Sequence, residues 1–124
     1  MHEHWGSEPE EHDYPAARAY LSLVLGDRLA AKLVKSLMRT EEIRKFAAKD
    51  ILRAASLPLL GTEDVEVAGD LAKVQDGKVL SPVLLVAGAP LLIADGYHRV
   101  CASYNLDEKT LVACRIVERK TDLA

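Results

Sequence analysis

The chain has 124 residues, 49% hydrophobic and 28% charged, with a formal net charge of −3. These values are typical of one folded domain, and the slight negative charge argues against strong non-specific binding of nucleic acid over the whole surface. No apolar run reaches the roughly 18 residues of a membrane-spanning helix, and the polar start is unlike a signal peptide. The two cysteines, Cys101 and Cys114, predict a reducing cytoplasmic location without disulfides. No membrane partner is expected.

Residues 1–13 are predicted to form a flexible acidic tail. They hold five acidic residues and three histidines and lack a periodic apolar pattern. Trp5 is expected to belong to this tail. His2 and His4 alone do not make a closed metal site, so no metal ligands are assigned. Residues 14–124 are predicted to form a single domain.

Two helices are predicted between residues 14 and 40, as an N-terminal helical extension. Pro15 suits the first turn of the first helix, and Asp27 is expected to cap the second. The second helix also carries basic residues, which could meet a phosphate backbone or simply form a solvated face: Arg28, Lys32, Lys35 and Arg39. Because the acidic tail would compete with DNA for these charges, we predict no sequence-specific DNA binding at physiological salt.

The rest of the chain predicts a small mixed sheet with helices, an α/β (α+β) fold whose motif-bearing core spans residues 43–118. Two alternatives fit residues 40–55: a helix starting at Thr40, or an edge strand over 43–47 leading to a short helix around 50–54. A helix is predicted to begin at Thr62 and end near Gly77. Strands follow over 82–86, 91–94 and 111–117, the first two as a hairpin.

A strand, a tight turn and a helix start meet in the sequence Asp95-Gly96-Tyr97-His98-Arg99. The first amides of a helix have no internal partner and attract anions. His98 and Arg99 would add side-chain donors suited to a phosphate. The alternative is that the turn only connects a strand to a helix.

From about residue 46 to 117, the order of features resembles the ParB/sulfiredoxin superfamily. The turn at residues 96–99 is similar to the sulfiredoxin Gly-Cys-His-Arg turn, and residues 51–53 are similar to an upstream arginine segment. The resemblance implies a small α/β domain that holds ATP or another nucleotide, or a phosphorylated small molecule. It implies that His98 and Arg99 contact the phosphates, that Gly96 and Tyr97 form the rest of the turn, and that Arg53 positions the reacting group.

The sequence also departs from the patterns of this superfamily. Tyr97 stands where sulfiredoxins carry their nucleophilic cysteine, so sulfinic acid reduction is not expected. The arginine-rich turn of partition proteins is absent as well. The turn is closer to the Asp-Gly-His-Thr-Arg of free-serine kinases, which implies a catalytic Asp95, Mg²⁺ and a second carboxylate from Glu63 or Glu66. Alternatively, Asp95 only caps the helix.

The predicted function is therefore a nucleotide- or phosphate-binding domain, with an ATP/ADP-dependent phosphotransferase or hydrolase as the candidate enzyme. The alternative is a non-enzymatic regulatory or partner-binding module that retains the fold. If Glu63 or Glu66 points into the same cleft as Asp95, the enzyme is favoured. If both point away, the module is favoured.

Overall fold

The computed structural model describes residues 4–119, which form five helices and a four-stranded mixed sheet. The sheet order is β1-β4-β2-β3, with β1 antiparallel to β4, β4 parallel to β2, and β2 antiparallel to β3. The strand bounds are Arg44–Ala47 for β1, Val83–Ala87 for β2, Leu92–Asp95 for β3 and Leu111–Glu118 for β4. The predicted mixed α+β class is confirmed, as is the hairpin of β2 and β3.

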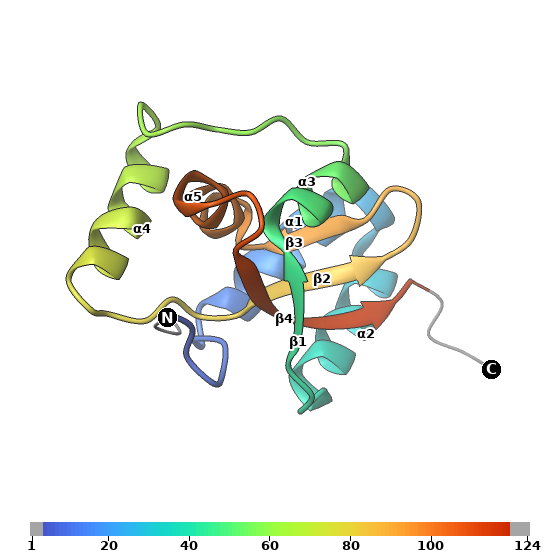
Figure 1. Cartoon of the computed structure of the whole chain (residues 1–124). Helices are drawn as coiled ribbons and strands as arrows, with labels where there is room; N and C mark the ends of the chain where they lie inside the picture. Colours follow the sequence, from blue (N-terminus) through green and yellow to red (C-terminus); the bar gives the residue numbers. More distant parts are fainter. Residues whose placement is uncertain (1–3, 120–124) are drawn as a thin grey trace.

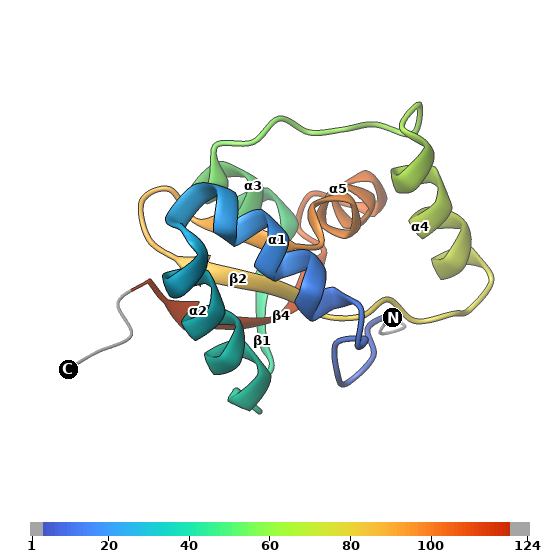
Figure 2. The same cartoon turned by 180° about the vertical axis from the view of Figure 1, so that it is seen from behind.

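Helices cover both faces of the sheet (Figures 1 and 2). One face carries α1 (Asp13–Leu25) and α2 (Asp27–Arg39), and the other carries α3 (Ala48–Ala55) and α5 (Tyr97–Leu106). The predicted helical extension is thus one of the covering layers of the sheet. None of the helices within residues 4–119 is long and apolar enough to cross a membrane.

Strand β2 shows why two layers of helices are needed. Leu84 and Val86 belong to the apolar cluster under α1 and α2, whereas Val83 and Leu85 belong to the cluster under α3 and α5. Successive side chains of a strand point to opposite faces, so an unbroken apolar run must be buried on both sides. These four side chains are at most 1% exposed.

Helix α4 (Val65–Gln75) lies outside this sandwich and packs against α5 (Figure 1). It buries a single residue, Val67. The helix was predicted to start at Thr62 and starts three residues later, because the Asp64 carboxylate accepts hydrogen bonds from the amides of Glu66 and Val67 and so caps it.

Two local expectations are decided by the structure. Of the alternatives for residues 40–55, the edge strand followed by a short helix is correct, since β1 pairs along its length with β4. The expected cap at Asp27 is wrong. Gly26, at a φ of +89°, is the N-cap of α2, and Asp27 is already its first helical residue without a capping hydrogen bond. A glycine reaches this backbone conformation at little cost.

Residues 4–13 also differ from the predicted tail, whereas residues 1–3 lie outside the described part. Trp5 is 9% exposed and belongs to the apolar cluster under α3 and α5. It forms a β-bridge with Leu80, and its Nε1 donates a hydrogen bond to the carbonyl of Leu111 at 3.0 Å. A large aromatic side chain near a terminus gains enough from burial to hold its segment on the domain.

Candidate functional site

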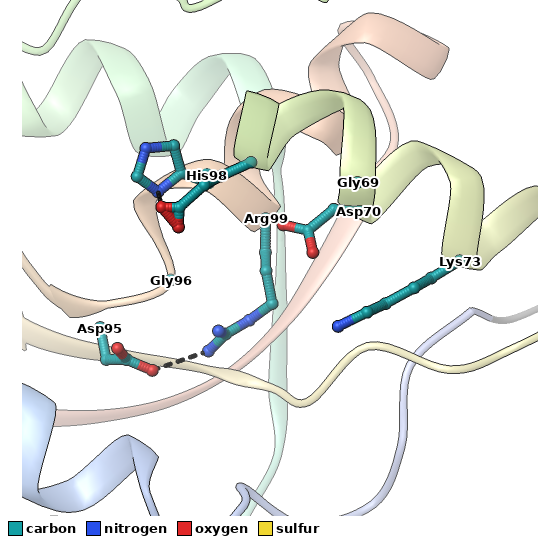
Figure 3. Close-up of a pocket in the computed structure, with 8 residues that line it drawn as sticks. Gly69, Asp70, Lys73, Asp95, Gly96, His98 and Arg99 are labelled. Atoms are coloured by element: carbon teal, nitrogen blue, oxygen red, sulfur yellow. Dashed lines mark hydrogen bonds and ion pairs between the residues drawn. The ribbon is translucent and has the colours of Figure 1, made fainter. Parts of the chain in front are cut away.

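A pocket of about 340 Å³ opens between α4, the end of β3 and the start of α5 (Figure 3). This volume is at the lower end of the range for small-molecule sites. Most of its lining is polar: Glu66, Gly69, Asp70 and Lys73 from α4, and Asp95, Gly96, His98 and Arg99 from the β3–α5 turn. The pocket therefore contains four of the six site residues predicted from sequence.

The turn into α5 depends on Gly96, which is the N-cap of the helix at a φ of +113°. A Cβ at this position would lie 2.8 Å from Val83 Cβ, closer still to Val83 Cγ1, and 2.9 Å from Arg99 Nη2. Only glycine allows this close approach of the backbone to β2 and to the guanidinium. Asp95 does not cap the helix, because α5 has no side-chain capping bond. The capping alternative for Asp95 is therefore wrong.

Arg99 is held firmly at the base of the pocket, with 15% of its side chain exposed. Its Nη2 lies 3.0 Å from Asp95 Oδ2 and donates to the carbonyl of Pro82 at 3.3 Å. Its Nε is buried and has no hydrogen-bond partner in the described part of the chain. A buried donor without a partner costs about 1–3 kcal/mol, and the ion pair of Arg99 with Asp95 offsets this cost.

A second carboxylate, from Asp13, also faces Arg99. Its Oδ2 lies 3.9 Å from Arg99 Nη2, and the side chain is 2% exposed. Burial raises the pKa of Asp95, the Arg99 charge opposes that rise, and the negative Asp13 adds to it. Sequence reasoning missed Asp13, which it placed in the tail, because an aspartate before a helix carries no sign of burial.

The imidazole of His98 faces the start of α4. Its Nε2 is 3.9 Å from Asp64 Oδ1, and its Nδ1 is 3.9 Å from Glu66 Oε2. Glu66 thus lines the same pocket as Asp95. Glu63 does not line it and accepts a hydrogen bond from the Gly61 amide instead. Of the two candidate second carboxylates, only Glu66 shares the pocket with Asp95.

Besides Gly69, two charged pocket residues were not expected from the sequence, Asp70 and Lys73. Figure 3 shows both reaching from α4 toward the space beside Arg99. Burial raises the pKa of the Asp70 carboxyl, while Arg99, Lys73 and His98 partly oppose the rise. A signal was available, because Glu66, Asp70 and Lys73 recur at the spacing of one helix face.

Two predicted site residues lie elsewhere. Arg53 is exposed in the last turn of α3 and does not line the pocket. Tyr97 does not line it either, and its hydroxyl donates a hydrogen bond to the carbonyl of Pro58, in the loop before α4. Tyr97 is therefore directed toward this loop, away from the candidate site.

No three carboxylate or histidine groups of the pocket come together as a ready metal site within residues 4–119. The ligand atoms that do lie within 4.8 Å of one another belong to Glu10, His12 and Asp13. His12 Nε2 is 3.1 Å from Glu10 Oε2 and 3.5 Å from Asp13 Oδ1, an ion-pair arrangement when the imidazole is protonated. A Mg²⁺ ion in the pocket would therefore need oxygen ligands from a bound phosphate as well.

Comparisons of the chain with protein-family models, with curated proteins and with solved structures give no significant match.

Proposed function

We propose that this pocket binds the phosphate of a nucleotide or of another phosphorylated small molecule, in a domain of ParB/sulfiredoxin type. The observation that carries the proposal is the lining of the pocket, which brings Arg99 and Lys73 together beside the start of α5. An arginine donor, an ammonium group and the first amides of a helix all favour phosphate oxygens. The pocket volume suits a small ligand or the phosphate end of a larger one.

The positions of Asp95 and Glu66 support an ATP- or ADP-dependent phosphotransferase or hydrolase. Both carboxylates line the pocket, which is the arrangement expected for phosphoryl transfer. Asp95 would orient the acceptor, and Arg99 would neutralise charge that develops on the phosphate. A bound Mg²⁺ would reduce the electrostatic repulsion between the ligand phosphates and these two carboxylates.

One observation favours the alternative of a non-enzymatic binding module. Asp95 Oδ2 already pairs with Arg99 at 3.0 Å, so one of the two carboxylate oxygens serves to hold the guanidinium and only Oδ1 is left to act on a ligand. In such a module, Asp95 would only hold Arg99 in place.

Calorimetric titration with ATP, ADP, CTP, GTP and inorganic phosphate, with and without Mg²⁺, tests the proposal. Binding of at least one of them should also raise the melting temperature, because a ligand of the folded state stabilises it. Release of phosphate from a bound nucleotide, measured over hours, would favour the enzyme over the module. If none of these compounds binds at millimolar concentration, the proposed function is wrong.

Replacing Lys73 with alanine is expected to weaken binding of the phosphate ligand about tenfold, the usual size of one lost charge-assisted hydrogen bond. Lys73 is exposed and makes no hydrogen bond or salt bridge with the rest of the described chain, so the free energy of unfolding should change by less than about 0.5 kcal/mol. Lys35→Ala, on the exposed face of α2, is the matched control. Equal affinities of the two variants would remove Lys73 from the site.

Gly69 gives a test that separates binding from stability. It lies in the interior of α4 and lines the pocket, and a Cβ there would meet nothing within 4 Å. Gly69→Ala should therefore stabilise the protein by about 0.5–1 kcal/mol, the helix penalty of glycine. Gly69→Leu should keep the fold and block the ligand, whereas Ala72→Leu, on the same helix outside the pocket, should leave binding intact. Unchanged affinity in Gly69→Leu would place the ligand elsewhere.

A further inference from the structure

Asp70 is a half-buried carboxylate that the chain itself leaves unsatisfied. It makes neither a hydrogen bond nor a salt bridge with any residue of the described range 4–119. The other carboxylates around the pocket have partners: Asp95 pairs with Arg99, Asp64 caps α4, and Glu66 faces His98. A polar group that is partly desolvated and unpaired costs free energy unless a ligand or water satisfies it.

The groups that face Asp70 come from two helices. Lys73 and Glu66 lie on its own helix, and Arg99 and His98 face it from α5. Arg99 is already engaged by Asp95 and by the Pro82 carbonyl, so it does not satisfy Asp70. Lys73 lies one turn further along α4, and side chains so spaced have Cβ atoms about 5–6 Å apart. An acceptor and a cation are thus placed side by side on the same wall of the pocket.

We propose that Asp70 accepts a hydrogen bond from a hydroxyl or amino group of the ligand, while Lys73 and the start of α5 bind the neighbouring anionic group. This inference rests on the proposed phosphate site and narrows the class of ligand that the site would bind. The ligand is a phosphorylated small molecule with a hydrogen-bond donor close to its phosphate, rather than a bare phosphate. Gly69, beside Asp70, leaves room for the body of that molecule.

The test compares three probes by calorimetry: inorganic phosphate, glycerol 3-phosphate and phosphoethanolamine. The first has no carbon-bound donor, the second has hydroxyl groups and the third has an ammonium group. The wild-type protein should bind one of the two donor-bearing probes at least about tenfold more tightly than inorganic phosphate, as one charge-assisted hydrogen bond implies. Equal affinities for all three would overturn the inference and leave the proposed phosphate site standing.

Variants at position 70 show which donor is used. Asp70→Ala should abolish the preference and, by removing a negative charge, should leave binding of inorganic phosphate equal or tighter. Asp70→Asn keeps an acceptor oxygen but removes the negative charge. If the wild-type protein prefers glycerol 3-phosphate, this variant should keep much of that preference, because a neutral oxygen still accepts from a hydroxyl group. If the wild-type protein prefers phosphoethanolamine, the variant should lose that preference, because the ammonium group needs the charge. Asp76→Asn, at the exposed end of α4, is the control. A preference that survives Asp70→Ala would overturn the inference, and no binding of any probe would overturn the phosphate site itself.

A ligand-free measurement checks the state of Asp70. Burial raises the pKa of this carboxyl from the ordinary 3.8, so the folded protein holds the proton more tightly than the unfolded chain. Stability therefore falls as the pH rises through the window above 3.8. In Asp70→Asn, the free energy of unfolding should decrease less steeply with pH than in the wild type. Some decrease should remain, because burial also raises the pKa of Asp95. If denaturant melts at pH 4 to 7 give parallel curves for Asp70→Asn and the wild type, Asp70 is solvated and the inference is wrong.

Discussion

Replacing Arg99 with methionine is expected to destabilise the protein by about 3 kcal/mol, the usual effect of removing one partner from a buried ion pair. The substitution keeps an apolar side chain of similar length but leaves Asp95 without the cation that lies 3.0 Å away. It also removes the guanidinium that lies 3.9 Å from Asp13 Oδ2, a carboxylate whose side chain is 2% exposed. Phosphate binding should be lost as well, because Arg99 supplies donors to the pocket.

Urea denaturation at pH 7 measures this effect. Arg53→Met, at an exposed position on α3, is the matched control and should change the free energy of unfolding by less than about 0.5 kcal/mol. Adding Asp95→Asn to Arg99→Met should recover part of the stability but none of the phosphate binding, because it removes a buried charge without restoring a donor. If the Arg99 and Arg53 variants are equally stable, Arg99 is not the structural centre of the site.

Replacing Gly96 with alanine is expected to cost about 3 kcal/mol, through a strained backbone and a steric clash together. The φ of +113° is a conformation that residues with a side chain rarely adopt, and the new Cβ would lie 2.8 Å from Val83 Cβ. Val83 is fully buried in β2, so it has little freedom to move aside. The new methyl group would also meet Arg99 Nη2 at 2.9 Å, so binding of phosphate should weaken in the fraction that folds.

Gly77→Ala, measured in the same denaturation experiment, separates the cost of backbone strain from the cost of the steric clash. Gly77 has a φ of +78°, and a Cβ there would meet nothing within 4 Å. Its replacement should therefore cost only the backbone strain, about 1 kcal/mol. A loss in Gly96→Ala no larger than that in Gly77→Ala would mean that the turn can shift to relieve its contact with Val83.

Local sequence patterns were sufficient for the elements whose signals lie within a few residues. The apolar run at 82–86, the short turn after it and the second run at 91–94 predicted the hairpin that β2 and β3 form. The Asp95-Gly96 turn likewise predicted where β3 ends and α5 begins, because a glycine between a strand and a helix start marks a sharp change of backbone direction. These features depend on backbone preferences and apolar periodicity, which are properties of the segment itself.

Only the tertiary structure decided the features that depend on distant partners. Residues 43–47 could be read as helix or strand until pairing of β1 with β4 supplied their hydrogen bonds. Trp5 is buried because its segment bridges to Leu80 and its indole donates to the carbonyl of Leu111, both far along the chain. In the candidate site, α4 brings Asp70 and Lys73 to the pocket, while Arg53 faces solvent on α3. Burial and charge pairing are set by which surfaces meet, and short-range sequence patterns do not encode which surfaces those are.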